Sequence, residues 1–133
     1  MPVVIKRHSL LIWLICGDLL TLLVVSIIGF ATHGEGISWR ILTTFLPYLA
    51  AWAMTAPWLG VYHPELSRDA RQTWRPALAA FLAAPMAAWL RALWLNRAIA
   101  PIFVLVLGLS AALGYGVWRL LWTVIVKRSK VYG

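Results

Sequence analysis

The stretch SLLIWLICGDLLTLLVVSIIGF, residues 9–30, decides the fold of this protein. It is apolar almost throughout and carries a single charged residue, Asp18. About 20 apolar residues, each rising about 1.5 Å along a helix, suffice to cross the hydrocarbon layer of a membrane. The run has full spanning length, and no small-residue cleavage pattern follows it. We therefore expect a membrane-spanning helix rather than a cleaved signal sequence.

Three further apolar runs follow at about residues 41–62, 76–95 and 101–126. Of the 133 residues, 62% are apolar and only 12% are charged, which leaves too few polar residues to cover a soluble domain. The sequence therefore predicts an all-α integral membrane protein. We expect one membrane domain over residues 1–133, folded as a bundle of four transmembrane helices.

Prolines divide this pattern into helices and bends. Pro76 and Pro101 stand at the start of the third and fourth runs, where a helix has no use for the missing N–H. Pro47 and Pro57 lie inside the second run, and Pro85 lies inside the third. Each of these three removes a backbone donor, so we expect bends there.

The basic residues indicate which ends of the helices face the cytoplasm. With four crossings, one side carries eight Lys and Arg: Lys6, Arg7, Arg68, Arg71, Arg75, Lys127, Arg128 and Lys130. The other side carries two, Arg40 and Arg97. The positive-inside bias then places both termini in the cytoplasm. Because the net charge of +8 gathers at the ends of apolar runs, we interpret it as a topology signal rather than a nucleic-acid surface.

Two charged residues lie deep inside the predicted helices, and we expect them to pair. Asp18 is about 14 Å along its helix from the cytoplasmic boundary, and Arg119 is about 12 Å from the same boundary. In lipid, an unpaired charge at this depth costs roughly several kcal/mol. Arg119 shares a helix face with small residues that favour close helix packing. The sequence therefore predicts an Asp18–Arg119 ion pair that joins the first and last helices.

Two tryptophans are predicted at the same level as this ion pair. Trp52 is about 15 Å deep in the second run, and Trp118 precedes Arg119. Their indole N–H groups could donate to Asp18, and their rings could stack on Arg119. Ordinary core packing explains the same two residues.

A second polar cluster is predicted at the opposite side of the membrane. Arg91 lies about 22 Å from the cytoplasmic boundary, close to the first loop with His33 and Glu35 and to Arg97 in the last loop. Two interpretations stay open. These four residues could form an outer cluster, or Arg91 could extend alone to the interface beside a solvated loop.

The pattern Asp18, Gly29, His33, Pro47, Trp52, Leu90-Arg91, Phe103 and Trp118-Arg119 resembles a family of prokaryotic membrane proteins, domain-of-unknown-function family 3054. The resemblance extends over nearly the whole chain. It implies a four-helix membrane bundle of this length in a prokaryotic plasma membrane. It implies no activity.

The chemistry of the chain favours a non-catalytic role. No serine–histidine–acid spacing, metal-ligand cluster or phosphate-binding loop is present, and the single Cys16 lies inside the first run. We therefore expect no enzyme and no metal. The best interpretation is an accessory or scaffold subunit that packs against a larger membrane complex, lipid or a hydrophobic cofactor such as a pigment or quinone. The nine tryptophans suit such contacts, but interface anchoring and core packing explain them equally well.

The alternative is a small proton-coupled transporter that works as a homo-oligomer. An acidic residue midway along the first of four short helices, here Asp18, could exchange protons against a cationic substrate. Arg119 at matching depth argues against this mechanism, because a carboxylate held by an arginine is a poor proton carrier at neutral pH.

Overall fold

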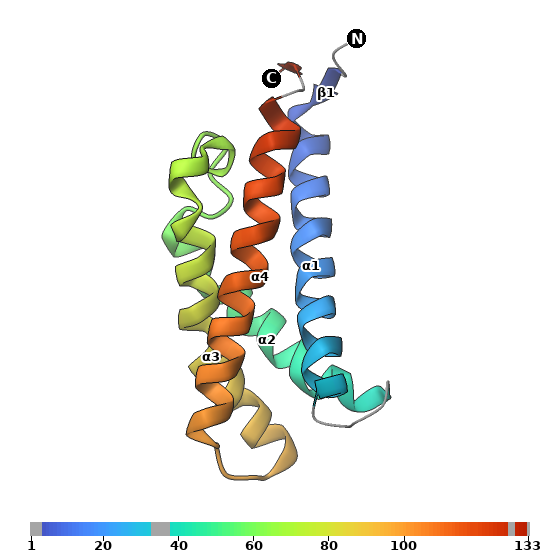
Figure 1. The fold of residues 1–133 in the computed structure, drawn as a ribbon, viewed down its shortest axis with the longest axis vertical. Coiled ribbons are helices and arrows are strands. Elements are labelled where there is room, and N and C mark those ends of the chain that lie inside the picture. The colour runs from blue at the N-terminus through green and yellow to red at the C-terminus, as the bar shows by residue number, and fades with distance from the viewer. Residues whose placement is uncertain (1–3, 33–37, 128–129, 133) are drawn as a thin grey trace.

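The computed structural model describes residues 4–32, 38–127 and 130–132 of the chain. Four α-helices form the body of the molecule, and two short strands lie where the chain begins and ends (Figure 1). The helices are α1 (Arg7–Thr32), α2 (Leu42–Thr55), α3 (Trp74–Leu95) and α4 (Pro101–Lys127). The strands β1 (Val4–Lys6) and β2 (Lys130–Tyr132) pair in parallel, with Val4 opposite Lys130.

Three helical segments in the described part of the chain are long and apolar enough to cross a membrane. They cover residues His8–Gly29, Ala70–Leu95 and Pro101–Lys127, and they correspond to the first, third and fourth runs of the sequence. The helical nature of the protein is confirmed. Each of these segments buries only a minority of its residues inside the molecule, as expected for helices that face lipid on their outer sides.

The second run differs from the single helix, bent at its two prolines, that was expected over residues 41–62. Its helix α2 ends at Thr55 and is 14 residues long, which is too short to span the hydrocarbon layer alone. A 3-10 turn, Pro57–Leu59, follows, and Gly60 then adopts a left-handed conformation with φ 66°. Pro57 cannot donate the next helical hydrogen bond, and glycine tolerates the left-handed region, so the chain turns here.

The connection between α2 and α3 stays at the same end of the molecule as the two termini (Figure 1). It contains two more 3-10 turns, Leu66–Arg68 and Ala70–Gln72. Asp69 begins the second of them, since its carboxylate accepts a hydrogen bond from the backbone N–H of Arg71. Helix α3 starts two residues before the expected position, so that Pro76 lies in its first turn.

Helix α3 packs against both α2 and α4, and α1 packs mainly against α4. The face of α3 in this core is built from alanines: Ala79, Ala80, Ala83, Ala84, Ala87 and Ala88 are all buried. Such small side chains allow neighbouring helices to approach closely. Gly108 of α4 is an example, because a Cβ there would lie 3.2 Å from the Cβ of Ala84.

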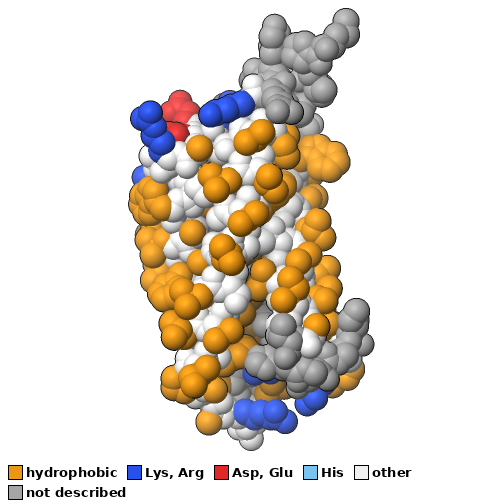
Figure 2. Space-filling model, in the orientation of Figure 1, with side chains coloured by type: hydrophobic (Ala, Val, Ile, Leu, Met, Phe, Trp, Pro, Cys, Tyr) orange, Lys and Arg blue, Asp and Glu red, His pale blue; other side chains and the backbone are white. Residues whose placement is uncertain are grey.

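The outer surface of the bundle is apolar along most of its length (Figure 2). Lysine and arginine side chains gather at its two ends, and an acidic side chain is visible at the end that carries the termini (Figure 2). This distribution is typical of a protein whose middle lies in lipid and whose ends lie at the membrane surfaces.

Candidate functional site

The structure brings Asp18 of α1 and Arg119 of α4 together inside the bundle. Arg119 donates two hydrogen bonds side by side, from Nε to Oδ1 of Asp18 at 3.0 Å and from Nη2 to Oδ2 at 2.8 Å. Only 2% of Asp18 and 3% of Arg119 are exposed, so this ion pair is shielded from both water and lipid. Such a two-point contact is the strongest geometry available to an arginine and a carboxylate.

Two neutral donors complete the surroundings of the carboxylate. Tyr62 donates its hydroxyl hydrogen to Oδ2 of Asp18 at 2.6 Å, and Trp118 donates its indole N–H to Oδ1 at 3.0 Å. Together with Arg119, these groups give each carboxylate oxygen two donors. An ionised carboxylate has about four acceptor positions, so the hydrogen-bonding capacity of Asp18 is filled.

The two tryptophans that were predicted at this level lie at different distances from the carboxylate. Trp118 contacts Asp18 directly. Trp52 is one step further away, because its indole N–H donates to the Tyr62 oxygen at 2.8 Å. The ring of Trp52 also stacks on Tyr115 of α4, with centroids 4.1 Å apart. Three helices and the segment after α2 therefore converge on one carboxylate.

Gly17 creates the space that Trp118 occupies. A Cβ at this position would lie 1.9 Å from Cζ2 of Trp118, which is far closer than two carbon atoms can approach. The indole ring therefore lies directly against the backbone of α1, and this position lets its N–H reach the neighbouring Asp18. The short sequence Gly17-Asp18 thus provides both the space for the tryptophan and the acceptor for its hydrogen bond.

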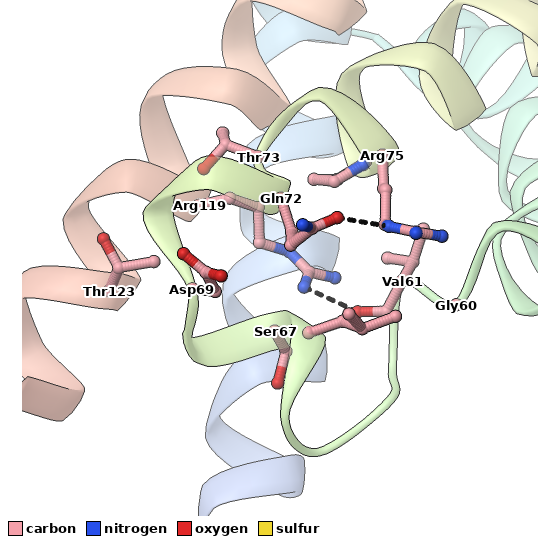
Figure 3. A pocket seen from close by; sticks show the side chains of 11 residues that line it. Gly60, Val61, Ser67, Asp69, Gln72, Thr73, Arg75, Arg119 and Thr123 are labelled. Carbon is pink, nitrogen blue, oxygen red and sulfur yellow. Dashed lines mark hydrogen bonds between the residues drawn. The ribbon is translucent and has the colours of Figure 1, made fainter.

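The segment after α2 covers one side of Arg119. Nη1 of Arg119 donates to the backbone oxygen of Val61 at 2.9 Å, and Arg75 donates to the side-chain oxygen of Gln72 (Figure 3). Arg75 also donates to the backbone oxygen of Leu59. A cavity of about 10 Å³ remains between these groups. It has room for about one water molecule.

The predicted outer cluster is described only in part. Arg91 and Arg97 line one cavity, near the connection between α3 and α4. The guanidinium carbon of Arg91 lies 4.9 Å from the centre of the Phe103 ring, in a cation–π arrangement. The other two members, His33 and Glu35, lie outside the described residues.

Several contributors to the buried centre were missed in the sequence. Tyr62 was expected at the end of a second helix bent at Pro47 and Pro57, at the membrane boundary. The turn at Gly60 redirects the chain, so that the Tyr62 hydroxyl reaches the level of Asp18. Two signals in the sequence pointed to these features. Pro57, three residues before Gly60, indicated the turn, and the interior Gly17, directly before the buried acid, indicated a close contact with a neighbouring helix.

The described residues 4–32, 38–127 and 130–132 contain no group of three or more His, Cys, Asp or Glu side chains that could hold a metal ion. Cys16 is exposed on the outer face of α1. The buried centre consists of the Asp18–Arg119 ion pair and the two aromatic donors, Tyr62 and Trp118.

The fold and this centre define a class of protein: a small helical bundle, compatible with a membrane, with an acid and a base neutralised in its interior. Residues 15–122 match the family described as "Protein of unknown function (DUF3054)". The match covers most of the chain and includes the ion pair, so the protein belongs to this family, as the sequence pattern indicated. No curated protein and no solved structure matches the chain.

Proposed function

We propose that this protein is a non-catalytic accessory or scaffold subunit of a membrane assembly. The observation that carries the proposal is the saturation of Asp18, whose two oxygens accept four hydrogen bonds from Tyr62, Trp118 and Arg119. A carboxylate without a remaining acceptor position is suited to hold helices together. It is poorly suited to bind and release a substrate cation or proton.

The outer surface supports the same role. Large apolar side chains are exposed on all of the long helices, whereas the interior is filled by alanines, larger aliphatic side chains and a few aromatic rings. Such a surface suits contact with lipid, with other membrane subunits or with a second copy of this chain. Exposed tryptophans, including Trp13, Trp39 and Trp58, also offer contact area for a flat pigment or quinone.

We infer four crossings of a prokaryotic plasma membrane, with both termini in the cytoplasm. The fourth crossing would consist of α2 together with its flanking 3-10 turns, residues 39–59, a stretch of roughly 30 Å at helical rise. Both termini and the segment that links α2 to α3 lie at one end of the bundle, as an even number of crossings requires (Figure 1). The excess of Lys and Arg in the sequence at this end favours the cytoplasm.

The role as a subunit is tested by purifying the tagged protein from its native membrane in a mild detergent. We expect larger membrane proteins, or a pigment or quinone, to purify with it at a fixed ratio, detected by mass spectrometry and an absorption spectrum. A tagged, unrelated small membrane protein is the control for non-specific association. A clean and colourless homo-oligomer would contradict the proposal.

The transporter alternative is tested on the same preparation. A carrier that uses Asp18 must release protons when a hydrophobic cation such as tetraphenylphosphonium binds, and Asp18→Asn must abolish the release. Because Asp18 is saturated by donors, we expect no proton release from either protein. Release from the wild type that disappears in Asp18→Asn would favour transport over a scaffold role.

A further inference from the structure

The small cavity beside Arg119 lies against the linker between α2 and α3 (Figure 3). Its volume of about 10 Å³ is the room that one water molecule needs. Its polar lining side chains come from the linker, the start of α3 and α4: Ser67, Asp69, Gln72, Thr73, Arg75, Arg119 and Thr123. We propose that this cavity is a hydration site, which holds one ordered water molecule that joins the Asp18–Arg119 ion pair to the linker.

Arg119 has two N–H groups left for such a water molecule. A guanidinium carries five N–H donors. Asp18 accepts from two of them and the backbone oxygen of Val61 accepts from a third. The other two, one on Nη1 and one on Nη2, have no acceptor within residues 4–32, 38–127 and 130–132. Only 3% of Arg119 is exposed, so bulk solvent reaches these groups poorly, and a buried donor without a partner costs free energy.

The linker and the turn before α3 offer acceptors to the same water molecule. The Thr73 hydroxyl donates to a backbone oxygen of the linker, and the side-chain oxygen of Gln72 accepts from Arg75, so both oxygens keep an acceptor position. The carboxylate of Asp69 adds further acceptor positions. A buried water molecule typically makes about three hydrogen bonds. One that accepts from Arg119 and donates to two of these oxygens reaches that number.

The charges around the cavity favour a neutral occupant over an ion. Arg75, Arg119 and Asp69 line the cavity, and Asp18 is bound to Arg119 directly behind it. The two positive and two negative charges cancel. A chloride ion would meet the carboxylate of Asp69, and a cation would meet two arginines, so either would add an uncompensated charge to a partly buried site. A water molecule leaves the balance unchanged.

Hydroxyl-radical labelling tests the hydration site directly. The full-length protein in dodecyl maltoside is irradiated with X-rays, which generate hydroxyl radicals from water, and the oxidised residues are located by mass spectrometry. Val61 and Val126 are matched probes: they are 2% and 6% exposed, but Val61 lines the cavity and Val126 does not. Radicals formed from a bound water molecule oxidise the nearest side chains, so we expect oxidation of Val61 and none of Val126. Equal protection of both valines would mean that the cavity is dry and would overturn the proposal.

Filling the cavity separates a bound water molecule from opening of the linker. Val61→Ile adds one methylene group at the cavity and keeps all of its polar groups, and Val126→Ile is the same change at a buried valine elsewhere. The probe is Pro76, a buried residue of the lining. Pro76 should be oxidised in the wild type and in Val126→Ile, and Val61→Ile should abolish this oxidation. Oxidation that persists in Val61→Ile would show that radicals enter as the linker opens, and would overturn the proposal. The comparison of Val61 with Val126 in the wild type needs no variant, so it decides the question if Val61→Ile does not fold.

Chloride is distinguished from water by the melting temperature in sodium chloride and in sodium gluconate at the same ionic strength. We expect no difference for the wild type. A higher melting temperature in chloride that disappears in Val61→Ile would assign the cavity to an anion and overturn the water molecule. The inference rests neither on the accessory role nor on the topology, so its failure would leave the tests of both untouched.

Discussion

At the scale of single residues, the buried Asp18 carboxylate explains more of this molecule than any other group. Its two oxygens accept hydrogen bonds from α4 and from Tyr62, which follows α2. Burial makes these bonds strong, but it also makes the loss of any one of them costly, because the group left behind cannot turn to water. The predictions at this scale therefore concern what happens when one partner is removed.

Removing Arg119 alone should destabilise the protein strongly. We expect Arg119→Leu to lower the free energy of unfolding by roughly 3–5 kcal/mol, because it leaves a buried charge without its partner. The double variant Asp18→Asn, Arg119→Leu should recover part of this loss. The measurement is reversible unfolding in mixed detergent micelles, with Arg40→Leu as a control at an exposed arginine. Equal losses in the single and double variants would show that the two residues are not energetically coupled.

Gly17 should be sensitive to the addition of one methyl group. Its Cβ would overlap the Trp118 ring at 1.9 Å, so Gly17→Ala must displace the indole and its hydrogen bond to Asp18. We expect a loss of roughly 1–3 kcal/mol in the free energy of unfolding. Gly116→Ala is the matched control, since a Cβ there meets no atom within 4 Å. It should be neutral or stabilising by up to about 1 kcal/mol.

A Trp118→Ala background shows whether the tryptophan causes this effect. Without the indole ring, Gly17→Ala should cost much less than it does in the wild type. An unchanged cost in that background would mean that the steric overlap at Gly17 is relieved in some other way.

At the scale of helices, α2 is held to α3 by a hydrogen bond from side chain to backbone as well as by packing. The hydroxyl of the fully buried Tyr48 donates to the backbone oxygen of Ala80, and Thr55 makes a longer contact with the backbone oxygen of Ala79. Alanine side chains bury little area each, so these polar contacts matter for the position of a short helix. Without them, α2 would have few directional contacts with its neighbour.

Tyr48→Phe isolates the stronger of these contacts, because it removes the hydroxyl and keeps the ring. We expect the free energy of unfolding to fall by about 1 kcal/mol, the usual net value of one hydrogen bond in a protein or a membrane. The change is measured in the same micelle assay. No change would indicate that packing alone positions α2.

The helix scale also shows where sequence reasoning failed. Hydropathy extends without a break from Ile41 to Tyr62, so the run predicted one helix of full spanning length. The backbone ends that helix at Thr55, because Pro57 and the left-handed Gly60 together prevent its continuation. A single proline bends a membrane helix; a proline followed closely by a glycine ended this one.

At the scale of the whole molecule, the arrangement of its ends predicts a topology. The linker between α2 and α3 and the connection between α3 and α4 lie at opposite ends of the bundle (Figure 1). The test uses Glu65→Cys and Ala98→Cys in a Cys16→Ala background, labelled on intact cells with a membrane-impermeant maleimide. Position 98 should react, and position 65 should react only after permeabilisation.

The reverse labelling pattern would contradict the cytoplasmic assignment of the termini. Labelling of both positions from the same side would contradict the four crossings themselves. Both outcomes are clear because Glu65 and Ala98 are exposed, so a lack of labelling reflects the membrane rather than burial within the protein.

The sequence by itself determined that the protein is helical and compatible with a membrane, and it predicted the partnership of Asp18 with Arg119. Both depend on one quantity, the position of a residue along a helix that crosses a layer of known thickness, and the constant rise per residue supplies that position. The sequence offered Trp118 as a donor to Asp18 beside ordinary core packing, and the tertiary structure shows the hydrogen bond. The tertiary structure alone decided that Tyr62 also donates to Asp18, that Gly17 makes room for the indole, and that Arg91 and Arg97 line one cavity. The rise per residue gives the position of a side chain along its helix. It does not give the neighbour that the side chain faces or the residue at which the chain turns, because both depend on how the helices pack.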